Sequence, residues 1–119
     1  MNIGRLAGKT FDKVINVEDE EIRFLSDEGN SYHLFHNQNC CESVSIEDIC
    51  GDLRDLEGVP ILTASEDSSH VNPEGVQPKF QDSFTWTFYR FSTIKGTVVI
   101  RWYGASNGYY SERVEFSEF

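Results

Sequence analysis

Residues 83–104 read SFTWTFYRFSTIKGTVVIRWYG, and they carry the strongest structural signal of the chain. Aromatic rings alternate with threonine from Phe84 to Phe88, and β-branched residues are frequent in the second half. Such alternation is typical of β-strands, in which successive side chains point to opposite faces. The central residues 93–96, TIKG, are suited to a turn, so the stretch predicts one long β-hairpin.

The register of this hairpin follows from the length of its turn. A turn made of the residues TIKG places Trp86 opposite Tyr103 and Phe88 opposite Arg101. Aromatic side chains fall on both faces, so each face has to be covered. We expect a helix to cover one face, and a second sheet, a subunit or a ligand to cover the other.

A second hairpin is expected nearer the N-terminus. Residues 21–26 and 31–36 flank the sequence DEGN at 27–30, whose glycine and asparagine accept the backbone angles of a tight turn. The residues expected on its buried face are Ile22, Phe24, Tyr32 and Leu34.

The segment after residue 44 predicts a helix. Ser45-Ile46-Glu47-Asp48 fits the helix-start pattern in which a serine hydroxyl accepts a hydrogen bond from the amide three residues on. Gly58 and Pro60 are suited to ending the helix. The apolar residues that recur at the spacing of one helical face are Ile46, Ile49, Leu53 and Leu56.

These elements predict one α+β domain, with a mostly antiparallel, curved β-sheet and one principal α-helix. A length of 119 residues suits a single domain, so residues 1–119 are expected to form one ligand-binding unit. Further strands are expected at residues 10–17, 61–66 and 109–116.

Residues 67–82 are rich in Ser, Pro, Gly, Asn and acidic side chains, and they predict a mobile acidic loop. Loops of this length are uncommon in compact domains unless they cover a ligand, serve an interface or are mobile insertions. A mobile insertion and a lid over a ligand are both compatible with the sequence.

Charge limits the range of partners. Twenty acidic and ten basic residues give a formal net charge of −10, which repels DNA and RNA polymers. An acidic chain can instead imitate a nucleic acid, or gather a few arginines around a small anionic ligand. With no long apolar run and no signal-peptide pattern, we expect a cytoplasmic protein without a membrane partner.

Cysteine and histidine are concentrated in one region, where His33 and His36 precede Cys40 and Cys41. Structural zinc sites usually separate their cysteines by two to four residues, so no metal site is expected. Neighbouring cysteines rarely bond to each other because ring closure between them is strained. We therefore expect Cys40 and Cys41 to be buried or half-buried thiols, and a protein with three cysteines, Cys50 included, to suit a reducing compartment.

No pattern of residues indicates covalent catalysis, and no cofactor is expected. The acidic neighbours Glu42, Glu47 and Asp48 raise the pKa of a nearby thiol, whereas a nucleophilic cysteine needs a lowered one. Nucleophile-elbow, P-loop and dinucleotide-binding motifs do not occur. We expect a protein that is not an enzyme and acts by binding.

Residues 101–111 contain the parts from which a nucleotide pocket is built. Aromatic rings stack on a base, arginine binds a phosphate, and amides contact polar edges. The alternative is an aromatic-rich sheet core with a tight turn. The candidate ligand-binding residues are Arg101 for phosphate, Asn107 for polar edges, Trp86, Phe88, Tyr103 and Tyr110 for stacking, and Arg90, Arg23 and Phe80 as further contacts.

Several blocks of sequence together resemble a family of small phage and prophage proteins, the Thoeris anti-defense proteins of the first type. The blocks cover most of the chain between Gly8 and Phe116, apart from residues 67–82. They are HNQNCCESV at 36–44, IEDICGDL at 46–53, TWTFY at 85–89, RWYG at 101–104 and SNGYYS at 106–111.

The resemblance implies a protein that sequesters cyclic ADP-ribose isomers made by bacterial TIR-domain enzymes and does not cleave them. Some members of that family also bind cyclic oligonucleotides. It further implies sheet-and-helix protomers that form dimers and hexamers in the cytoplasm of the host cell. The alternative is an acidic interaction protein that inhibits a nucleic-acid-binding host enzyme by mimicry, and a small hydrolase is the third hypothesis.

Overall fold

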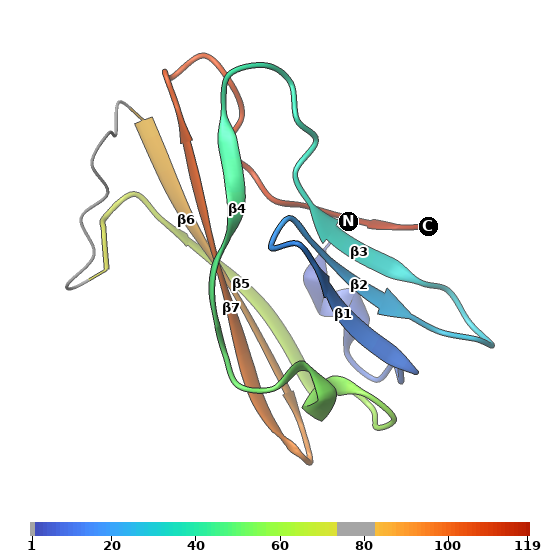
Figure 1. Ribbon diagram of the computed structural model, residues 1–119. Helices are drawn as coiled ribbons and strands as arrows, with labels where there is room; N and C mark the ends of the chain where they lie inside the picture. Colours follow the sequence, from blue (N-terminus) through green and yellow to red (C-terminus); the bar gives the residue numbers. More distant parts are fainter. Residues whose placement is uncertain (1, 74–82) are drawn as a thin grey trace.

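The protein consists of two four-stranded antiparallel β-sheets that face each other (Figure 1). The computed structural model describes residues 2–73 and 83–119. The first sheet has the strand order β1-β2-β3-β8 and the second β4-β7-β6-β5. The strands of the first sheet are β1 (Lys13–Val17), β2 (Glu21–Leu25), β3 (Tyr32–Phe35) and β8 (Glu115–Glu118).

The second sheet has the longer strands. Its centre is the hairpin of β6 (Ser83–Thr93) and β7 (Gly96–Ser106), with 11 residues in each strand. It is flanked by β4 (Ser43–Cys50) and β5 (Thr63–Ser69). Strands in the first sheet have only four or five residues, so one end of the hairpin extends past it, as Figure 1 shows.

Both predicted hairpins are confirmed. In the β6–β7 hairpin, Trp86 pairs with Tyr103 and Phe88 pairs with Arg101. In the second, β2 and β3 pair in antiparallel register. The four residues expected on its buried face are at most 1 % exposed, namely Ile22, Phe24, Tyr32 and Leu34.

The predicted helix is wrong, and with it the α+β fold class. Residues 43–50 form β4, which pairs with β7 along its length, with an irregularity between Ile46 and Asp48. Helical structure in the described part of the chain is limited to the 3-10 turns η1 (Ile3–Leu6) and η2 (Leu53–Leu56). The fold is therefore all-β, because pairing with β7 outweighs the local helix-start signal.

Other segment boundaries also differ from the prediction: the strands expected at 10–17 and 61–66 begin at Lys13 and Thr63. The acidic loop was expected to begin at Asp67, but β5 continues to Ser69. The last strand begins at Glu115, so most of the strand expected at 109–116 is instead a connection without regular structure. Residues 74–82 of the expected loop lie outside the described residues.

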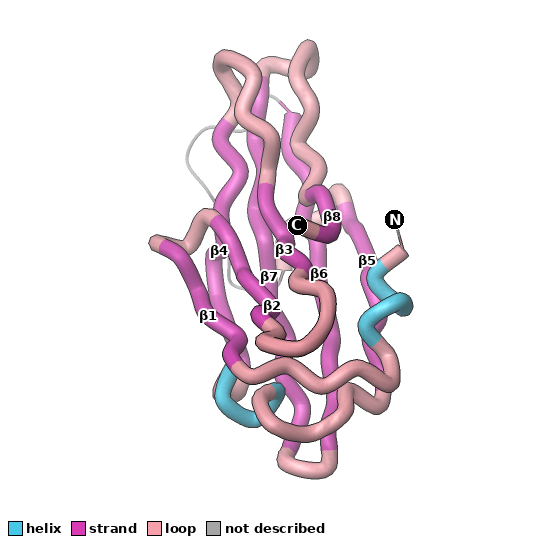
Figure 2. The backbone as a smooth tube through the Cα atoms, turned by 90° about the vertical axis from the view of Figure 1, so that its right-hand side faces the viewer, coloured by secondary structure: helices cyan, strands magenta, loops and turns pink. Residues whose placement is uncertain are grey.

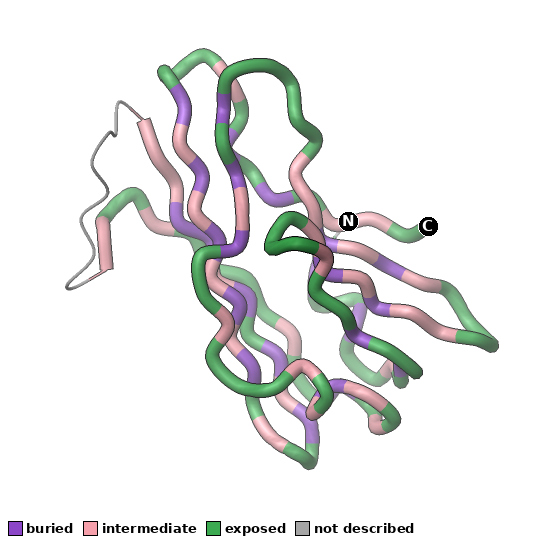
Figure 3. Tube along the Cα trace, in the orientation of Figure 1, coloured by how far each residue is buried: buried purple, intermediate pink, exposed green. Residues whose placement is uncertain are grey.

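The core lies where the two sheets face each other, and buried positions concentrate there (Figure 3). The ring of Phe24 in the first sheet lies 5.4 Å from that of Phe91 in the second and 5.5 Å from that of Phe11, measured between centroids. The inner face of the long hairpin is thus covered by a second sheet, one of the covers expected for one face, whereas the helix expected over the other face does not form.

The short 3-10 turns close the edges of this arrangement. Figure 2 shows η1 beside β5, where Ile3 and Leu6 are buried. The side chain of Asp52 accepts a hydrogen bond from the amide of Arg54 and so begins η2. Among the described residues there is no helix with the length and apolar character needed to cross a membrane.

We expect Phe91→Ala to lower the free energy of unfolding by about 3–5 kcal/mol, because it opens a cavity between the sheets. Chemical denaturation followed by tryptophan fluorescence measures this change. Ile94→Ala is the matched control: Ile94 is 78 % exposed in the β6–β7 turn, so its truncation should change stability by no more than about 0.5 kcal/mol. Equal effects of the two substitutions would contradict the assignment of the core.

Candidate functional site

Five of the predicted ligand-binding residues lie on one face of the second sheet. They alternate along β6 and β7 with core residues such as Tyr89 and Trp102, so they are on the face that points away from the first sheet. This outer face carries Trp86, Phe88, Arg90, Arg101 and Tyr103.

Both arginines of the outer face already have carboxylate partners. Nε of Arg101 donates to the carboxylate of Glu47, and the hydrogen bond raises the pKa of Arg101 above its ordinary value. Arg90 donates from Nη1 to Asp67 over 2.8 Å. A phosphate on this face would have to compete with these carboxylates, which weakens the predicted role of Arg101.

The ring expected to stack on a base is covered. Trp86 is 0 % exposed, and its indole N–H donates to Oδ1 of Asn72 over 3.0 Å. The guanidinium of Arg101 lies 5.4 Å from the centroid of the Trp86 ring, and the Tyr103 ring lies 4.6 Å away. Phe84, Phe88 and Tyr103 are half-buried aromatic residues of the same face.

The remaining predicted residues lie elsewhere. Asn107 follows the end of β7, six residues beyond Arg101, which corresponds to about 20 Å along an extended strand. Tyr110 lies in the same connection, and Arg23 is in β2 of the other sheet. Phe80 lies outside the described residues. Arg101 and Asn107 therefore do not line one concavity in the described part of the protomer.

A polar cleft of about 540 Å³ opens on the opposite, inner face of the second sheet. It lies at the end of the β6–β7 hairpin that extends past the core. Along the inner face of β6, the apolar residues Phe91 and Tyr89 give way to Thr87 and Thr85, which line the cleft. The other residues that line it are Glu66, Ser68, His70, Arg113, Val114, Glu115 and Phe116.

The cleft contains both donors and acceptors. The guanidinium of Arg113 makes no ion pair with any residue that the structure describes. His70 donates from Nδ1 to the main-chain oxygen of Phe84 over 3.1 Å. Glu66 and Glu115 contribute carboxylates. A guanidinium with hydroxyls can bind a phosphate, and carboxylates can accept hydrogen bonds from sugar hydroxyls.

The cleft was not predicted from the sequence. The threonines at 85 and 87 were interpreted only as residues that alternate with aromatic residues along a strand. Their position marks the end of the apolar inner face, because the next inner residues are Tyr89 and Phe91. That change from hydroxyl to apolar side chains along β6 was the signal in the sequence that could have predicted the cleft. The presence of Arg113 in it could not be predicted, because it depends on how the chain crosses between the sheets.

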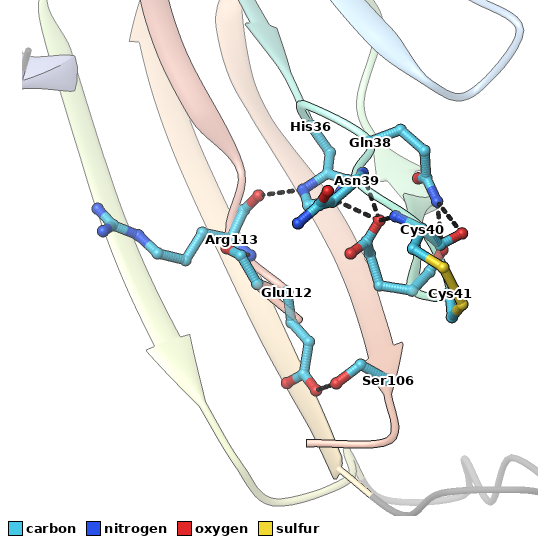
Figure 4. Close-up of polar contacts among 10 residues, drawn as sticks. His36, Gln38, Asn39, Cys40, Cys41, Ser106, Glu112 and Arg113 are labelled. Carbon is cyan, nitrogen blue, oxygen red and sulfur yellow. Dashed lines mark hydrogen bonds and ion pairs between the residues drawn. A yellow bond between two sulfur atoms is a disulfide. The ribbon is translucent and has the colours of Figure 1, made fainter. Parts of the chain in front are cut away.

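Two buried carboxylates hold the connections beside the cleft. Glu112 accepts hydrogen bonds from the hydroxyls of Ser106 over 2.6 Å and Thr85 over 2.9 Å (Figure 4 shows the first). Burial raises the pKa of Glu112, but hydrogen bonds from Ser106, Ser83 and Thr85 outweigh it, so the pKa lies below its ordinary value. A Cβ at Gly104 would lie 2.7 Å from the main-chain oxygen of Glu112, so this approach needs glycine.

Glu42 plays the same part in the segment between β3 and β4. It accepts hydrogen bonds from the amides of Asn39 over 2.7 Å and Cys40 over 3.1 Å, and it lies 3.7 Å from Nε2 of His36 (Figure 4). Burial raises the pKa of Glu42, but these amides and the nearby His36 outweigh it and keep the pKa below its ordinary value.

The prediction for the cysteines is wrong. Cys40 and Cys41 are exposed and joined by a disulfide bond, and Cys50 is an exposed thiol. His33 lies apart from the cysteines, on the first sheet, where its ring contacts Glu21 and Ser117. Within residues 2–73 and 83–119, no three His, Cys, Asp or Glu side chains are grouped so that they could hold a metal ion.

Comparison with known proteins identifies a family but no activity. The model of the family described as "Domain of unknown function (DUF7448)" matches residues 4–116. The chain therefore belongs to this family. No curated protein and no solved structure matches it.

We expect Glu112→Gln to lower the free energy of unfolding at pH 7 by about 1–3 kcal/mol, because it weakens a charged, buried hydrogen-bond acceptor. The folded-state pKa of Glu112 is lowered, so its stabilisation is present above the unfolded pKa of about 4.3 and is lost as the pH falls through the folded value.

Thermal melts between pH 7 and pH 3 measure this dependence. The melting temperature of Glu112→Gln should vary less with pH than that of the parent protein. Glu28→Gln, at an exposed turn position, is the control and should follow the parent. A parent-like acid profile for Glu112→Gln would contradict the role assigned to this carboxylate.

Proposed function

We propose that this member of the DUF7448 family is a non-catalytic binding protein. It sequesters a small phosphate-bearing nucleotide in the cleft between its two sheets. The nucleotide is of the cyclic ADP-ribose class that the resemblance to Thoeris anti-defense proteins implies. The proposal depends on the place of Arg113, which lines a cleft that also contains hydroxyls and makes no ion pair with a carboxylate of the described residues.

Electrostatics favours Arg113 over the arginines of the outer face. A net charge of −10 opposes the approach of any anion, so a phosphate needs a local group of donors. Arg101 and Arg90 have carboxylate partners, whereas the guanidinium of Arg113 is available for a bidentate contact. Thr87 supplies a hydroxyl to the same space, whereas the Thr85 hydroxyl donates its proton to Glu112.

The rest of the cleft fits the other parts of a nucleotide. Its volume of about 540 Å³ is within the roughly 300–1,000 Å³ range of small-molecule pockets. Glu66 and Glu115 can accept hydrogen bonds from ribose hydroxyls. Val114 and Phe116 offer an apolar wall to a base. Phe116 is itself stacked on Tyr32, with 5.5 Å between the ring centroids, so its ring is held in place.

Sequestration needs only affinity and slow release, and it needs no reactive group. Within this proposal, the protein acts in the cytoplasm of a host cell and lowers the concentration of an immune signal. Copies of the chain associate into the dimers or hexamers that the resemblance implies. Phe88, half-buried on the outer face, is suited to lie in a contact between copies.

We expect Arg113→Ala to weaken binding of cyclic ADP-ribose isomers by about tenfold to a hundredfold, because a charged hydrogen bond contributes about 1.5–3 kcal/mol. Isothermal titration calorimetry measures the affinity. Denaturing release and mass spectrometry then test whether the ligand is recovered intact, as sequestration requires.

Arg101→Ala is the matched control, since it removes the same type of side chain from the outer face and should leave affinity nearly unchanged. Loss of binding in Arg101→Ala alone would move the site to the outer face. Recovery of an altered ligand would indicate an enzyme. Absence of binding by the parent protein would refute the proposal and favour the acidic interaction protein.

A further inference from the structure

The disulfide between Cys40 and Cys41 does not serve stability in the usual way. A disulfide stabilises a protein mainly by closing a long loop in the unfolded chain. This bond joins two cysteines that are adjacent in the sequence, so it closes almost no loop. Both residues are exposed, so small molecules can reach the sulfur atoms.

Glu42 holds the main chain around the disulfide. Its Oε1 accepts hydrogen bonds from the amides of Asn39 and Cys40, over 2.7 and 3.1 Å. The side-chain amide of Gln38 donates to the main-chain oxygens of Cys40 over 3.4 Å and Glu42 over 2.7 Å. A change of backbone conformation at Cys40 therefore changes the hydrogen bonds of a buried carboxylate.

His36 connects this carboxylate to the cleft. Its side chain is 5 % exposed and that of Glu42 is 0 % exposed. Nε2 of His36 lies 3.7 Å from Oε1 of Glu42, and Nδ1 donates to the main-chain oxygen of Arg113 over 2.7 Å. Figure 4 shows the contact between the ring of His36 and the main chain of Arg113, and the side chain of Arg113 pointing away from that ring.

We propose that Cys40 and Cys41 form a reversible thiol–disulfide site for low-molecular-weight thiols, and that its redox state is transmitted through Glu42 and His36 to Arg113. The transmission to a ligand rests on the proposed function of the cleft; the redox site and the structural coupling do not. Disulfides in reducing compartments are usually transient and redox-sensing, which suits such a site.

The reaction is two successive thiol–disulfide exchanges. A thiolate attacks one cysteine sulfur, breaks the Cys40–Cys41 bond and forms a mixed disulfide, and the released cysteine thiolate takes up a proton. A second thiolate attacks the sulfur of the small molecule in the mixed disulfide and displaces the other cysteine. Two thiols are thus oxidised to one small disulfide while the protein gains two thiols, and oxidised glutathione drives the reverse reaction.

The intact disulfide restricts the backbone of Cys40 and Cys41, the two residues that precede Glu42. Reduction gives these two residues more conformational freedom, so the hydrogen bonds from the amides of Asn39 and Cys40 to Glu42 have to be formed against a larger entropy cost. The oxidised protein is therefore the form in which the cleft is better pre-organised.

Labelling with iodoacetamide tests the redox site. After treatment with oxidised glutathione, we expect the folded protein to take up one label, at Cys50, and after dithiothreitol to take up labels at all three cysteines. The labelling is done on the variant Cys50→Ser as well, because oxidised glutathione can also react with the exposed thiol of Cys50. Stable glutathione adducts at Cys40 or Cys41, or dimers linked through them, in place of the internal bond would overturn the proposal. Labelling of all three residues after oxidation would also overturn it.

Hydrogen–deuterium exchange tests the coupling without any ligand. Reduction should speed exchange in residues 36–42 and in residues 111–116, and leave the β2–β3 hairpin unchanged. The double variant Cys40→Ser, Cys41→Ser should behave like the reduced protein with or without dithiothreitol. A change confined to residues 36–42 would show that the disulfide turn does not communicate with the cleft.

The variant His36→Asn tests the coupling between the disulfide and the cleft separately from the formation of the disulfide. Asparagine keeps a donor near the position of Nδ1 and removes the edge of the ring that faces Glu42. Labelling should still report a reversible disulfide in this variant, but the redox-dependent exchange in residues 111–116 should disappear. Persistence of that difference in a folded His36→Asn protein would exclude His36 as the link.

Calorimetry with cyclic ADP-ribose isomers completes the test. We expect the oxidised protein to bind at least about fivefold more tightly than the reduced protein, at the lower end of typical coupling between sites. Equal affinities of the two forms would refute the control of binding. If neither form binds, the proposed function fails, whereas the redox site and its coupling are still decided by labelling and exchange.

Discussion

The unequal length of the two sheets is the constraint on which the structure depends. The first sheet covers only part of the inner face of the β6–β7 hairpin, and within that part the hairpin carries large apolar side chains such as Phe91 and Ile100. Beyond it the same face carries Thr85 and Thr87. Apolar residues are buried where a second layer exists, and hydroxyls line the space where it ends, so the core and the cleft share one continuous pair of strands.

The large excess of acidic residues shapes the site. Arginines on the open outer face lie within reach of carboxylates on neighbouring strands, as Arg90 does with Asp67 and Arg101 with Glu47. Glu112, next to Arg113 in sequence, instead turns inward to the hydroxyls of Ser106 and Thr85. The guanidinium of Arg113 thereby keeps its capacity to bind an anion in a chain of net charge −10.

The crossing from each sheet to the other brings distant parts of the sequence together. The segment between β3 and β4 contains the disulfide, and the segment between β7 and β8 contains Arg113. The hydrogen bond from His36 to the main chain of Arg113 joins them across 77 positions in the sequence. The exposed cysteines are therefore connected, through the buried side chains of Glu42 and His36, to Arg113, the residue on which binding is proposed to depend.

The two hairpins could be predicted from sequence, because the pairing of Trp86 with Tyr103 and the burial of Ile22 and Phe24 follow from local alternation and turn chemistry. The conformation of residues 43–50 could not, because a local helix-start signal there competes with pairing to β7, a partner about fifty positions away. The outcome of that competition is set by tertiary contacts. The tertiary structure also decided the cleft, because an inner face becomes core or cavity according to how far the opposite sheet extends, and that distance is not encoded in any single segment.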